Sequence, residues 1–311
     1  MRELRIAFAG TGTFAVPVLT ALAKEYPPVL VITQPDRPAG RGLKSQPPPV
    51  KLAAAEMGLP VFQPASINAP DSVEKLRELN LDLLVVAAYG QILKKRVLEL
   101  PRLGCVNVHA SLLPKYRGAA PVAWAILHGE SITGVTVFLM DEGMDTGPIL
   151  LQRPVEIRPE ETRGELEARL AEVGGELVVK AVADYAAGKL VPKPQPREGT
   201  RAPLLKKDLG QIDWSWPATK VHNWIRGLNP WPGAFTSFRG KKLRLLRSRL
   251  AAAGSPTSPP GSILPERGRL VVACGEGAVE LLEVQLAGKR RLSGRDFLNG
   301  YRPAPGERLG T

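Results

Sequence analysis

The sequence LRIAFAGTGTFA occupies residues 4–15 and decides which class of fold to expect. Its first six residues are an apolar run of strand length, and a glycine-rich turn follows immediately. A helical pattern extends from there to about Tyr26, and residues 29–33 form a second apolar run. A strand, a tight turn, a helix and another strand in this order are typical of a parallel, doubly wound sheet. We therefore expect an α/β fold whose N-terminal part is a mostly parallel sheet.

The glycine-rich turn also fits the dinucleotide fingerprint G-x-G-x-x-A across residues 10–15. Asp36 lies close to the distance at which that motif places a carboxylate for a ribose. However, Asp36 stands between Pro35 and Pro38, and the rigidity of these prolines moves it away from a ribose position. We favour a structural tight turn over a nicotinamide site.

A long basic insertion follows at residues 35–49, PDRPAGRGLKSQPPP. Connections between a strand and a helix usually take about two to six residues, so this one is unusually long. It carries Arg37, Arg41 and Lys44, and its prolines predict that it forms neither helix nor strand. A flexible basic segment at the ligand-binding edge of a sheet is more often functional than idle, although a plain disordered surface loop is the alternative.

Polar residues follow three later apolar runs of strand length. The run at residues 105–109 ends in Asn107 and His109. The run at residues 135–139 leads into the acidic loop DEGMDT at residues 141–146. In an open α/β sheet, ligands bind beyond the carboxyl ends of the strands. We therefore expect these polar residues to meet at that edge of the sheet. The runs cover residues 83–88, 105–109 and 135–139.

The C-terminal third of the chain has a different organisation. A regular amphipathic helix is predicted over residues 162–188, and a capping box of Thr162 and Glu165 starts it. Residues 189–207 are rich in proline and charge without periodicity and are predicted to be an interdomain linker. Several short strand-like runs follow between turns, which predicts a small β-barrel. The expected domains are residues 1–188 and 208–311.

The net charge of +12 is concentrated in the tail of the chain. Residues 201–311 carry 19 lysine and arginine residues against 8 acidic ones, a net charge of +11, whereas residues 1–200 are close to neutral. This asymmetry indicates that the tail domain meets a polyanion, although a merely soluble basic surface is the alternative.

Sequence features also indicate the compartment. Cys105 and Cys274 lie in apolar surroundings far apart in the sequence, so we expect two reduced thiols and a cytoplasmic protein. No apolar run approaches the length of a membrane span, and the N-terminus lacks a signal-peptide layout, so a soluble protein without a membrane partner is expected.

With these motifs in view, the chain resembles the folate-dependent formyltransferases, and within them the methionyl-tRNA formyltransferase family. The resemblance covers nearly the whole chain. The NVH, SLLP and MDEGMDTG elements are shared by formyl transferases and hydrolases, whereas the basic insertion and tail point to aminoacyl-tRNA. The matching segments are residues 107–109, 111–114, 117–121 (RGAAP), 140–147, 34–42 (QPDRPAGRG), 212–214 (IDW) and 229–232 (NPWP).

The resemblance implies both the architecture and the reaction. Residues 1–188 would be a Rossmann-like formyltransferase domain, and residues 208–311 a basic, OB-like barrel that binds tRNA. The reaction would transfer the formyl group of 10-formyltetrahydrofolate to the α-amine of methionyl initiator tRNA. No metal is expected, and we expect a monomer.

Three residues are predicted to carry the chemistry. Asn107 offers an amide donor to an oxyanion, and His109, on the same side of its strand, can donate as well or shuttle a proton. Spacing alone does not choose among Asp141, Glu142 and Asp145 as the partner of His109; the family resemblance selects Asp145.

The resemblance also implies the binding residues. Folate would contact Tyr89, Gln91, Ser111, Leu112, Leu113 and Pro114. The acceptor tRNA would contact Arg37, Arg41 and Lys44, with Arg41 as the central contact.

Two other classes of function remain open from the sequence. One is a formyl-folate enzyme with another acceptor, either a hydrolase that uses water or a transferase that acts on a small amine. A small acceptor gives no reason for the charge on the tail domain. The other is a non-catalytic RNA-binding protein, which would leave Asn107, His109 and Asp145 without a purpose.

Overall fold

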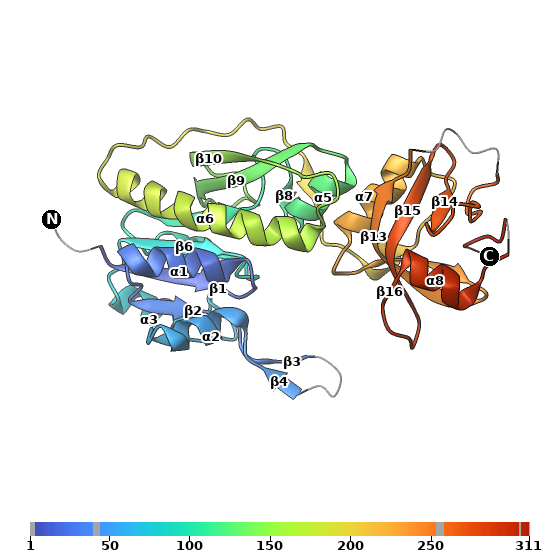
Figure 1. The fold of residues 1–311 in the computed structure, drawn as a ribbon. Coiled ribbons are helices and arrows are strands. Elements are labelled where there is room, and N and C mark those ends of the chain that lie inside the picture. The colour runs from blue at the N-terminus through green and yellow to red at the C-terminus, as the bar shows by residue number, and fades with distance from the viewer. Residues whose placement is uncertain (1–3, 40–43, 253–257, 305, 311) are drawn as a thin grey trace. The chain divides into compact units, whose positions relative to one another are not determined.

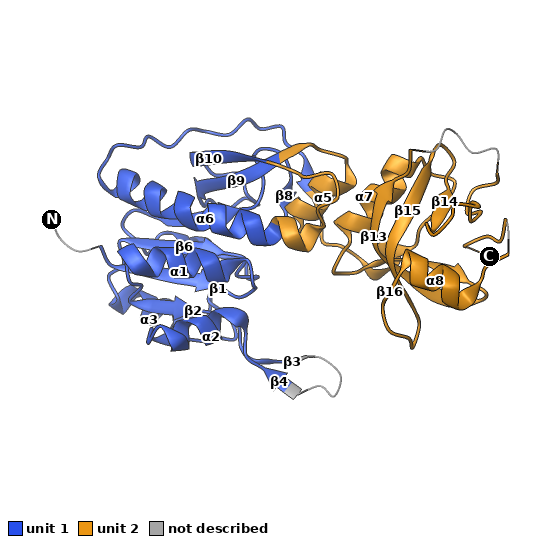
Figure 2. Ribbon diagram, viewed as in Figure 1, with its two compact units in different colours: residues 1–118, 133–155, 167–201 blue, residues 119–132, 156–166, 202–311 orange. Residues whose placement is uncertain are grey.

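A computed structural model describes residues 4–39, 44–252, 258–304 and 306–310 of the chain. The chain divides into two compact units, and neither is continuous in sequence (Figure 2). Unit 1 comprises residues 1–118, 133–155 and 167–201, and unit 2 comprises residues 119–132, 156–166 and 202–311. The segment predicted as a linker, residues 189–207, contributes to both units.

Unit 1 is built on one seven-stranded sheet with the strand order β10-β9-β7-β6-β1-β2-β5. The strands from β7 to β5 run parallel to their neighbours, and β1 and β6 are buried along their whole length. Complete burial explains why these strands read as uninterrupted apolar runs. The predicted α/β, mostly parallel sheet is confirmed. The strands are β1 Ile6–Gly10, β2 Leu30–Ile32, β5 Val61–Phe62, β6 Leu83–Ala87, β7 Cys105–His109, β9 Ile132–Leu139 and β10 Ile149–Glu156.

The strand β9 runs antiparallel to β7, which corrects one step of the sequence interpretation. Val106 pairs with Leu139 and His109 pairs with Thr136, so β9 ends beside the beginning of β7. The acidic loop therefore begins at the end of the sheet where β7 starts, whereas His109 is at the end where β7 finishes. The loop must fold back to reach His109. A strand's direction in the sheet is not encoded in its apolar pattern, which is why the sequence missed this.

Helices cover both faces of the sheet in unit 1 (Figure 1). One face carries α1 (Ala15–Glu25) and α6 (Arg163–Ala186), which pack so closely that Gly174 of α6 lies against Val108 of β7. The opposite face is packed with Ile67, α3 (Pro70–Glu78) and α4 (Lys95–Leu98). The helix α2 (Pro49–Glu56) adjoins α1. The short strand β8 (Arg117–Gly118) precedes α5 (Pro121–Leu127).

The basic insertion forms a hairpin of two short strands, β3 (Arg37–Ala39) and β4 (Lys44–Gln46), separate from the main sheet. The expectation that prolines exclude strands here was wrong, because Pro38 stands in a two-stranded ribbon where its missing N–H can face away from the partner. Arg37 is exposed on β3, the side chain of Lys44 is not described, and Arg41 lies outside the described residues.

Asp36, at the base of the hairpin, is held by neighbouring side chains. Lys51 Nζ lies 2.8 Å from its Oδ2, and Gln63 Nε2 donates to its Oδ1 at 2.7 Å. Hydrogen bonds from Gln63 and Lys51 lower the pKa of this carboxyl. The hydroxyl of Thr11 in the glycine-rich turn donates to the carbonyl of Tyr89 at 2.7 Å. These contacts fit the structural interpretation of the turn.

Unit 2 contains a five-stranded antiparallel sheet with the order β12-β13-β15-β14, and β16 pairs with β15. A register shift at Arg247 interrupts the pairing of the long strand β13, and a bulge of this kind bends a strand. The OB-like expectation is met by this curled sheet. β11 (Arg201–Ala202) pairs with β8 and is not part of this sheet. The elements that follow are the 3₁₀ turn Lys207–Gly210, α7 Ala218–Gly227, β12 Ala234–Phe238, β13 Lys241–Leu250, β14 Val271–Ala273, β15 Ala278–Leu286, β16 Leu292–Ser293 and α8 Gly294–Tyr301.

Smaller expectations are also met. Thr162 and Glu165 form the predicted capping box, with the Glu165 carboxylate accepting from Thr162 N at 2.9 Å. Cys105 and Cys274 are free and buried, and burial raises the pKa of each thiol to about 12. Among the described residues, no helix combines the length and apolar character of a bilayer span.

The contact between α6 and β7 makes a stability prediction. A Cβ atom added at Gly174 would lie 2.9 Å from Val108 Cγ1, so Gly174→Leu should destabilise unit 1 by about 1–3 kcal/mol through overpacking. Glu172→Leu introduces the same side chain at an exposed position of the same helix and should change stability far less. The measurement is denaturant unfolding followed by circular dichroism. Equal midpoint shifts in both variants would contradict close packing at Gly174.

Candidate active site

His109 is the last residue of β7, and its ring is held by the main chain of a neighbouring loop. Nε2 lies 2.9 Å from the carbonyl oxygen of Tyr116. A carbonyl can only accept, so Nε2 must carry a proton in this contact. In the neutral ring, the lone pair is then on Nδ1. The residue is 6% exposed, and Nδ1 is the ring nitrogen that remains for a contact with another group.

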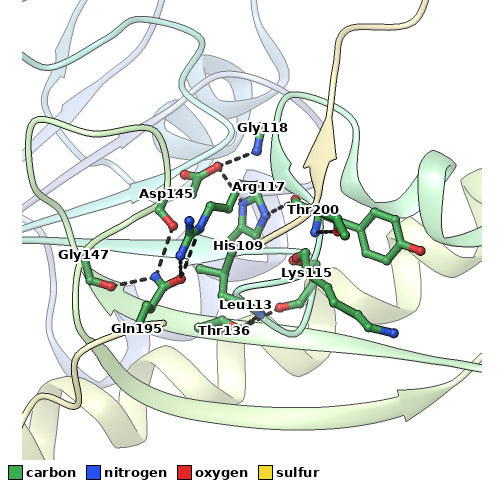
Figure 3. Close-up of polar contacts among 12 residues, drawn as sticks. His109, Leu113, Lys115, Arg117, Gly118, Thr136, Asp145, Gly147, Gln195 and Thr200 are labelled. Atoms are coloured by element: carbon green, nitrogen blue, oxygen red, sulfur yellow. Dashed lines mark hydrogen bonds and ion pairs between the residues drawn. The ribbon is translucent and has the colours of Figure 1, made fainter. Parts of the chain in front are cut away.

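Asp145, in the acidic loop, faces the Nδ1 side of the His109 ring (Figure 3). Its Oδ2 lies 3.6 Å from His109 Nδ1 and accepts a hydrogen bond from Gly118 N at 2.8 Å. The His–Asp distance exceeds an ordinary hydrogen bond, as expected when two acceptors face each other. If Nδ1 gains a proton, the same geometry becomes a close ion pair. Asp145 can therefore stabilise a protonated His109.

Asn107 lies two residues before His109 on β7, so the two side chains project from the same face of the sheet. Its side chain is half-buried and makes no hydrogen bond to any other residue in the described part of the chain. A partly buried amide without a partner is costly unless something else uses it. Asn107 therefore has a donor available for a ligand.

The other two acidic residues of the loop have different surroundings. The Asp141 carboxylate accepts from Gly143 N at 3.0 Å and from the Thr146 hydroxyl at 2.7 Å, so it stabilises its own loop. Glu142 is exposed and lines a cavity with residues 92–99. Of the three carboxylates that spacing left open, the structure places only Asp145 beside His109.

A cavity of about 560 Å³ lies between the segment after β6 and the acidic loop. Ile92, 76% exposed, lies on its wall. Its cationic residues are Lys94, Lys95 and Arg96, of which Lys95 pairs with Glu99 at 3.7 Å. This combination of exposed apolar surface and cations suits a flat ligand that carries carboxylates. The cavity is lined by Ile92, Leu93, Lys94, Lys95, Arg96, Glu99 and Glu142.

The SLLP turn, predicted to contact folate, is tied into the fold. Ser111 is fully buried and its hydroxyl donates to the carbonyl of Lys115 at 2.6 Å. Leu113 is 3% exposed, and its N–H and carbonyl bond to Thr136 and Gln152. Leu112 and Pro114 remain half-buried, so they are the members of this turn that can offer contact surface.

Tyr89 is buried and Gln91 is held by hydrogen bonds. The Tyr89 ring is 2% exposed, and burial raises the pKa of its hydroxyl to about 12. Gln91 accepts from Ile67 N at 2.8 Å and donates to Ala65 O at 3.3 Å. The residues that extend this segment into the cavity are Ile92 and Leu93 instead.

The remaining histidines are part of unit 2. His222 is buried between Ser248 Oγ and Pro159 O, each 2.9 Å from a ring nitrogen, and burial lowers its pKa. His128 stacks against Trp124 with ring centroids 5.4 Å apart. The sequence interpretation treated both as structural, and their surroundings agree with it.

Sequence reasoning missed Arg117 and Gln195, which hold the loops around His109 (Figure 3). Gln195 lies in the proline-rich stretch predicted to be a linker. The available signal was weak: Arg117 stands in the shared RGAAP element, and Gln195 is a polar residue between two prolines.

Two family models match the chain. One, described as formyl transferase, matches residues 4–182, and the other, described as formyl transferase, C-terminal domain, matches residues 204–302. The chain is 49% identical to a methionyl-tRNA formyltransferase of Solibacter usitatus (strain Ellin6076), over 99% of both chains. It is 47% identical to a methionyl-tRNA formyltransferase of Citrifermentans bemidjiense, over 100% of this chain and 98% of the relative.

Solved structures share the fold at lower identity. WlaRD, a sugar 3N-formyl transferase solved in the presence of dTDP and 5-N-formyl-THF, is 20% identical with a TM-score of 0.67. The match covers 93% of this chain and 100% of that one. HypX from Aquifex aeolicus, in complex with tetrahydrofolic acid, is 18% identical with a TM-score of 0.64, and this chain spans 48% of it.

The contact of His109 with Tyr116 predicts one tautomer. At about pH 8, where an ordinary imidazole is neutral, His109 should carry its proton on Nε2. The chain has three histidines, so ¹⁵N spectra of histidine-labelled protein can be assigned with the His109→Asn variant. His128, which is exposed and packs beside Trp124, gives a second histidine signal for comparison. A protonated Nδ1 in His109 would contradict the hydrogen bond to the Tyr116 carbonyl.

Proposed function

The chain belongs to the methionyl-tRNA formyltransferase family, and on that premise we propose how its residues perform the reaction. It formylates methionyl initiator tRNA. The proposed donor is 10-formyltetrahydrofolate. The observation that carries the proposal is the uncommitted amide of Asn107 beside the His109–Asp145 pair at the end of β7.

The reaction joins the α-amine nitrogen to the formyl carbon and breaks the bond from that carbon to N10 of the folate. The formyl oxygen becomes an oxyanion on the way, the amine loses a proton, and N10 gains one. An α-amine has a pKa of about 8 and is partly neutral near pH 7, so it can attack without a serine or cysteine nucleophile. The protein must hold two substrates together, stabilise the oxyanion and move a proton.

Asn107 is proposed to donate to the oxyanion. Its amide has no other partner among the described residues, and it projects from the strand end where ligands of this sheet type bind. A donor held on a strand costs no reorganisation when the charge develops.

His109 is proposed to move the proton, with Asp145 as its counter-charge. Nε2 already donates to the Tyr116 carbonyl, so the lone pair available to a substrate is on Nδ1. When Nδ1 takes the proton from the attacking amine, the ring becomes positive 3.6 Å from Asp145 Oδ2. His109 can then return the proton to the departing N10. This narrows the sequence interpretation, in which His109 was a second oxyanion donor or a proton shuttle.

The folate is proposed to occupy the cavity between residues 92–99 and Glu142. Exposed Ile92 offers apolar surface to a flat ring, and Leu112 and Pro114 add contact surface nearer the catalytic strand. The glutamate carboxylates of a folate would meet Lys94 and Arg96, neither of which forms an ion pair with a described residue. Tyr89 and Gln91 would contribute through the main chain alone.

The acceptor tRNA is proposed to contact both the basic C-terminal residues and the β3–β4 hairpin. Residues 201–311 carry a net charge of +11, which suits phosphate contacts. Arg37, Arg41 and Lys44, all from the basic insertion at residues 35–49, would meet the acceptor end. We place the reaction in the cytoplasm and propose a monomer, since the three proposed catalytic residues lie in one chain.

Asn107→Ala should lower the rate of formyl transfer by about 10²–10³-fold, because one oxyanion donor is lost. The assay mixes the protein with 10-formyltetrahydrofolate and charged initiator tRNA and measures N-formylmethionine. Wild-type protein should give that product, and release of formate without tRNA would instead indicate a hydrolase.

Ser237→Ala serves as the matched control, because it removes a small polar group far from β7 in the sequence and should leave the rate unchanged. Near-normal turnover of Asn107→Ala would remove Asn107 from the mechanism.

Arg37→Leu should raise the KM for charged tRNA several-fold and leave folate affinity unchanged, because the hairpin is proposed to meet the acceptor. Arg37 is exposed on β3, so its loss should not disturb the core. Arg77→Leu, an exposed change on α3, controls for the loss of one surface charge. Equal effects of the two variants on tRNA binding would leave the hairpin without a specific role.

A further inference from the structure

We propose that Gln195 is a positioning residue that holds the two loops around His109 in register. Its Nε2 donates to the carbonyls of Asp145 and Gly147, at 3.1 and 2.7 Å. Its Oε1 accepts from Arg117, at 2.9 Å from Nη2 and 3.3 Å from Nε. One side chain from outside both loops therefore bridges the loop of Asp145 and the segment of Arg117 (Figure 3).

The Gln195 carboxamide is saturated. A carboxamide has two N–H donors and two acceptor lone pairs, and all four are used here. The amide orientation follows from its partners, because the nitrogen faces two carbonyls and the oxygen faces a guanidinium. A group without a spare donor or acceptor has none for a substrate. Any effect of Gln195 on the reaction must therefore pass through its neighbours.

The Arg117 guanidinium is also held by several bonds, and four of its five N–H groups have an acceptor. Nη2 also donates to the carbonyl of Pro196 at 2.9 Å, and Nη1 donates to that of Arg197 at 3.2 Å. The main chain adds two bonds, from Tyr116 N to Thr200 Oγ1 at 2.8 Å and from Arg117 N to Thr200 O at 2.9 Å. Residues 195–200 therefore hold residues 116 and 117 at several points.

The segment of residues 116–118 in turn contacts both His109 and Asp145, the proposed proton-transfer pair. Tyr116 presents its carbonyl to His109 Nε2, and Gly118 presents its N–H to Asp145 Oδ2. Gln195 fixes the main chain of Asp145 from the other side. The His109–Asp145 distance thus depends on two segments, and Gln195 is the side chain that ties these two segments together.

The backbone at Asp145 explains why such a tie is needed. Its φ of +55° is in the left-handed region, which is unfavourable for a residue with a side chain. Two carbonyls of the same loop turn toward Gln195, and without its donors they would be free to rotate toward water. A displacement of about 1 Å at a reacting group can cost about 10²-fold in rate.

Gln195→Glu tests the proposal with little change in shape. The variant keeps an oxygen for Arg117 but places a second oxygen against the carbonyls of Asp145 and Gly147. We expect kcat to fall about 10- to 100-fold, with KM for charged tRNA and folate affinity within about twofold of wild type. The ¹⁵N signals of His109 should also change, which a merely structural role would not require.

Gln285→Glu is the matched control. Gln285 lies in β15 of unit 2 and also donates Nε2 to a main-chain carbonyl, that of Lys289 at 2.9 Å. The substitution makes the same change of charge and loses the same type of bond, and it should leave kcat unchanged.

The inference rests on the proposed roles of His109 and Asp145, so Asp145→Asn is measured in parallel. Full activity of Asp145→Asn would sink the proposed mechanism itself. An impaired Asp145→Asn beside a fully active Gln195→Glu would overturn the role of Gln195 alone. A fall in folate affinity as large as the fall in kcat would also overturn it, because Gln195 would then act in binding.

If Gln195→Glu loses its unfolding transition, the uncharged Gln195→Ala replaces it. A folded Gln195→Ala with reduced kcat and intact substrate binding supports the proposal, and unchanged kcat overturns it.

Discussion

The antiparallel direction of β9 is the constraint on which the site depends. It sends the acidic loop away from His109, so the loop must turn back along the sheet to deliver the Asp145 carboxylate. Because the loop folds back, its residues make close contacts with one another and with β9. Asp141 caps the loop from within, and Gly147 passes so close to β9 that a Cβ atom there would lie 1.8 Å from the carbonyl of Leu139. A loop of this shape needs outside support, and Gln195 supplies two donors to it.

Much of the fold could be predicted because its signals are local. Uninterrupted apolar runs become fully buried parallel strands, and the apolar stripe and capping box of residues 162–188 become α6. The direction of β9 and the β3–β4 hairpin could not be predicted in this way. Strand direction depends on which neighbours a strand meets, and a short hairpin outside the sheet buries too little to leave an apolar pattern.

The site residues also differ in whether a local sequence pattern predicts them. Asn107 and His109 could be paired from the sequence, because a strand places residues two apart on one face. Asp145 could not be chosen over Asp141 or Glu142 by spacing and needed the family resemblance. Gln195 was hidden, because a hydrogen bond between segments about fifty residues apart leaves no periodicity in either. Its proline-rich setting indicated a linker. In the structure, residues 193–200 are part of unit 1 and hydrogen-bonded within it.

The hydrogen bond of His109 to Tyr116 also bears on how much oxyanion stabilisation and substrate positioning each contribute to the rate. While Nε2 donates to Tyr116, the neutral ring has no second N–H to offer an oxyanion, and the Asn107 amide is the proposed donor. One such donor lowers the barrier by about 3–4 kcal/mol, whereas holding two reactants in an attack geometry can lower it by about 7–11 kcal/mol. From these magnitudes we expect positioning of the two substrates to contribute more to the rate than the oxyanion donor. A site that depends on positioning requires rigid loops. The side chains of Arg117 and Gln195 fit this requirement, because they bond to each other and to main-chain carbonyls of the segments around His109.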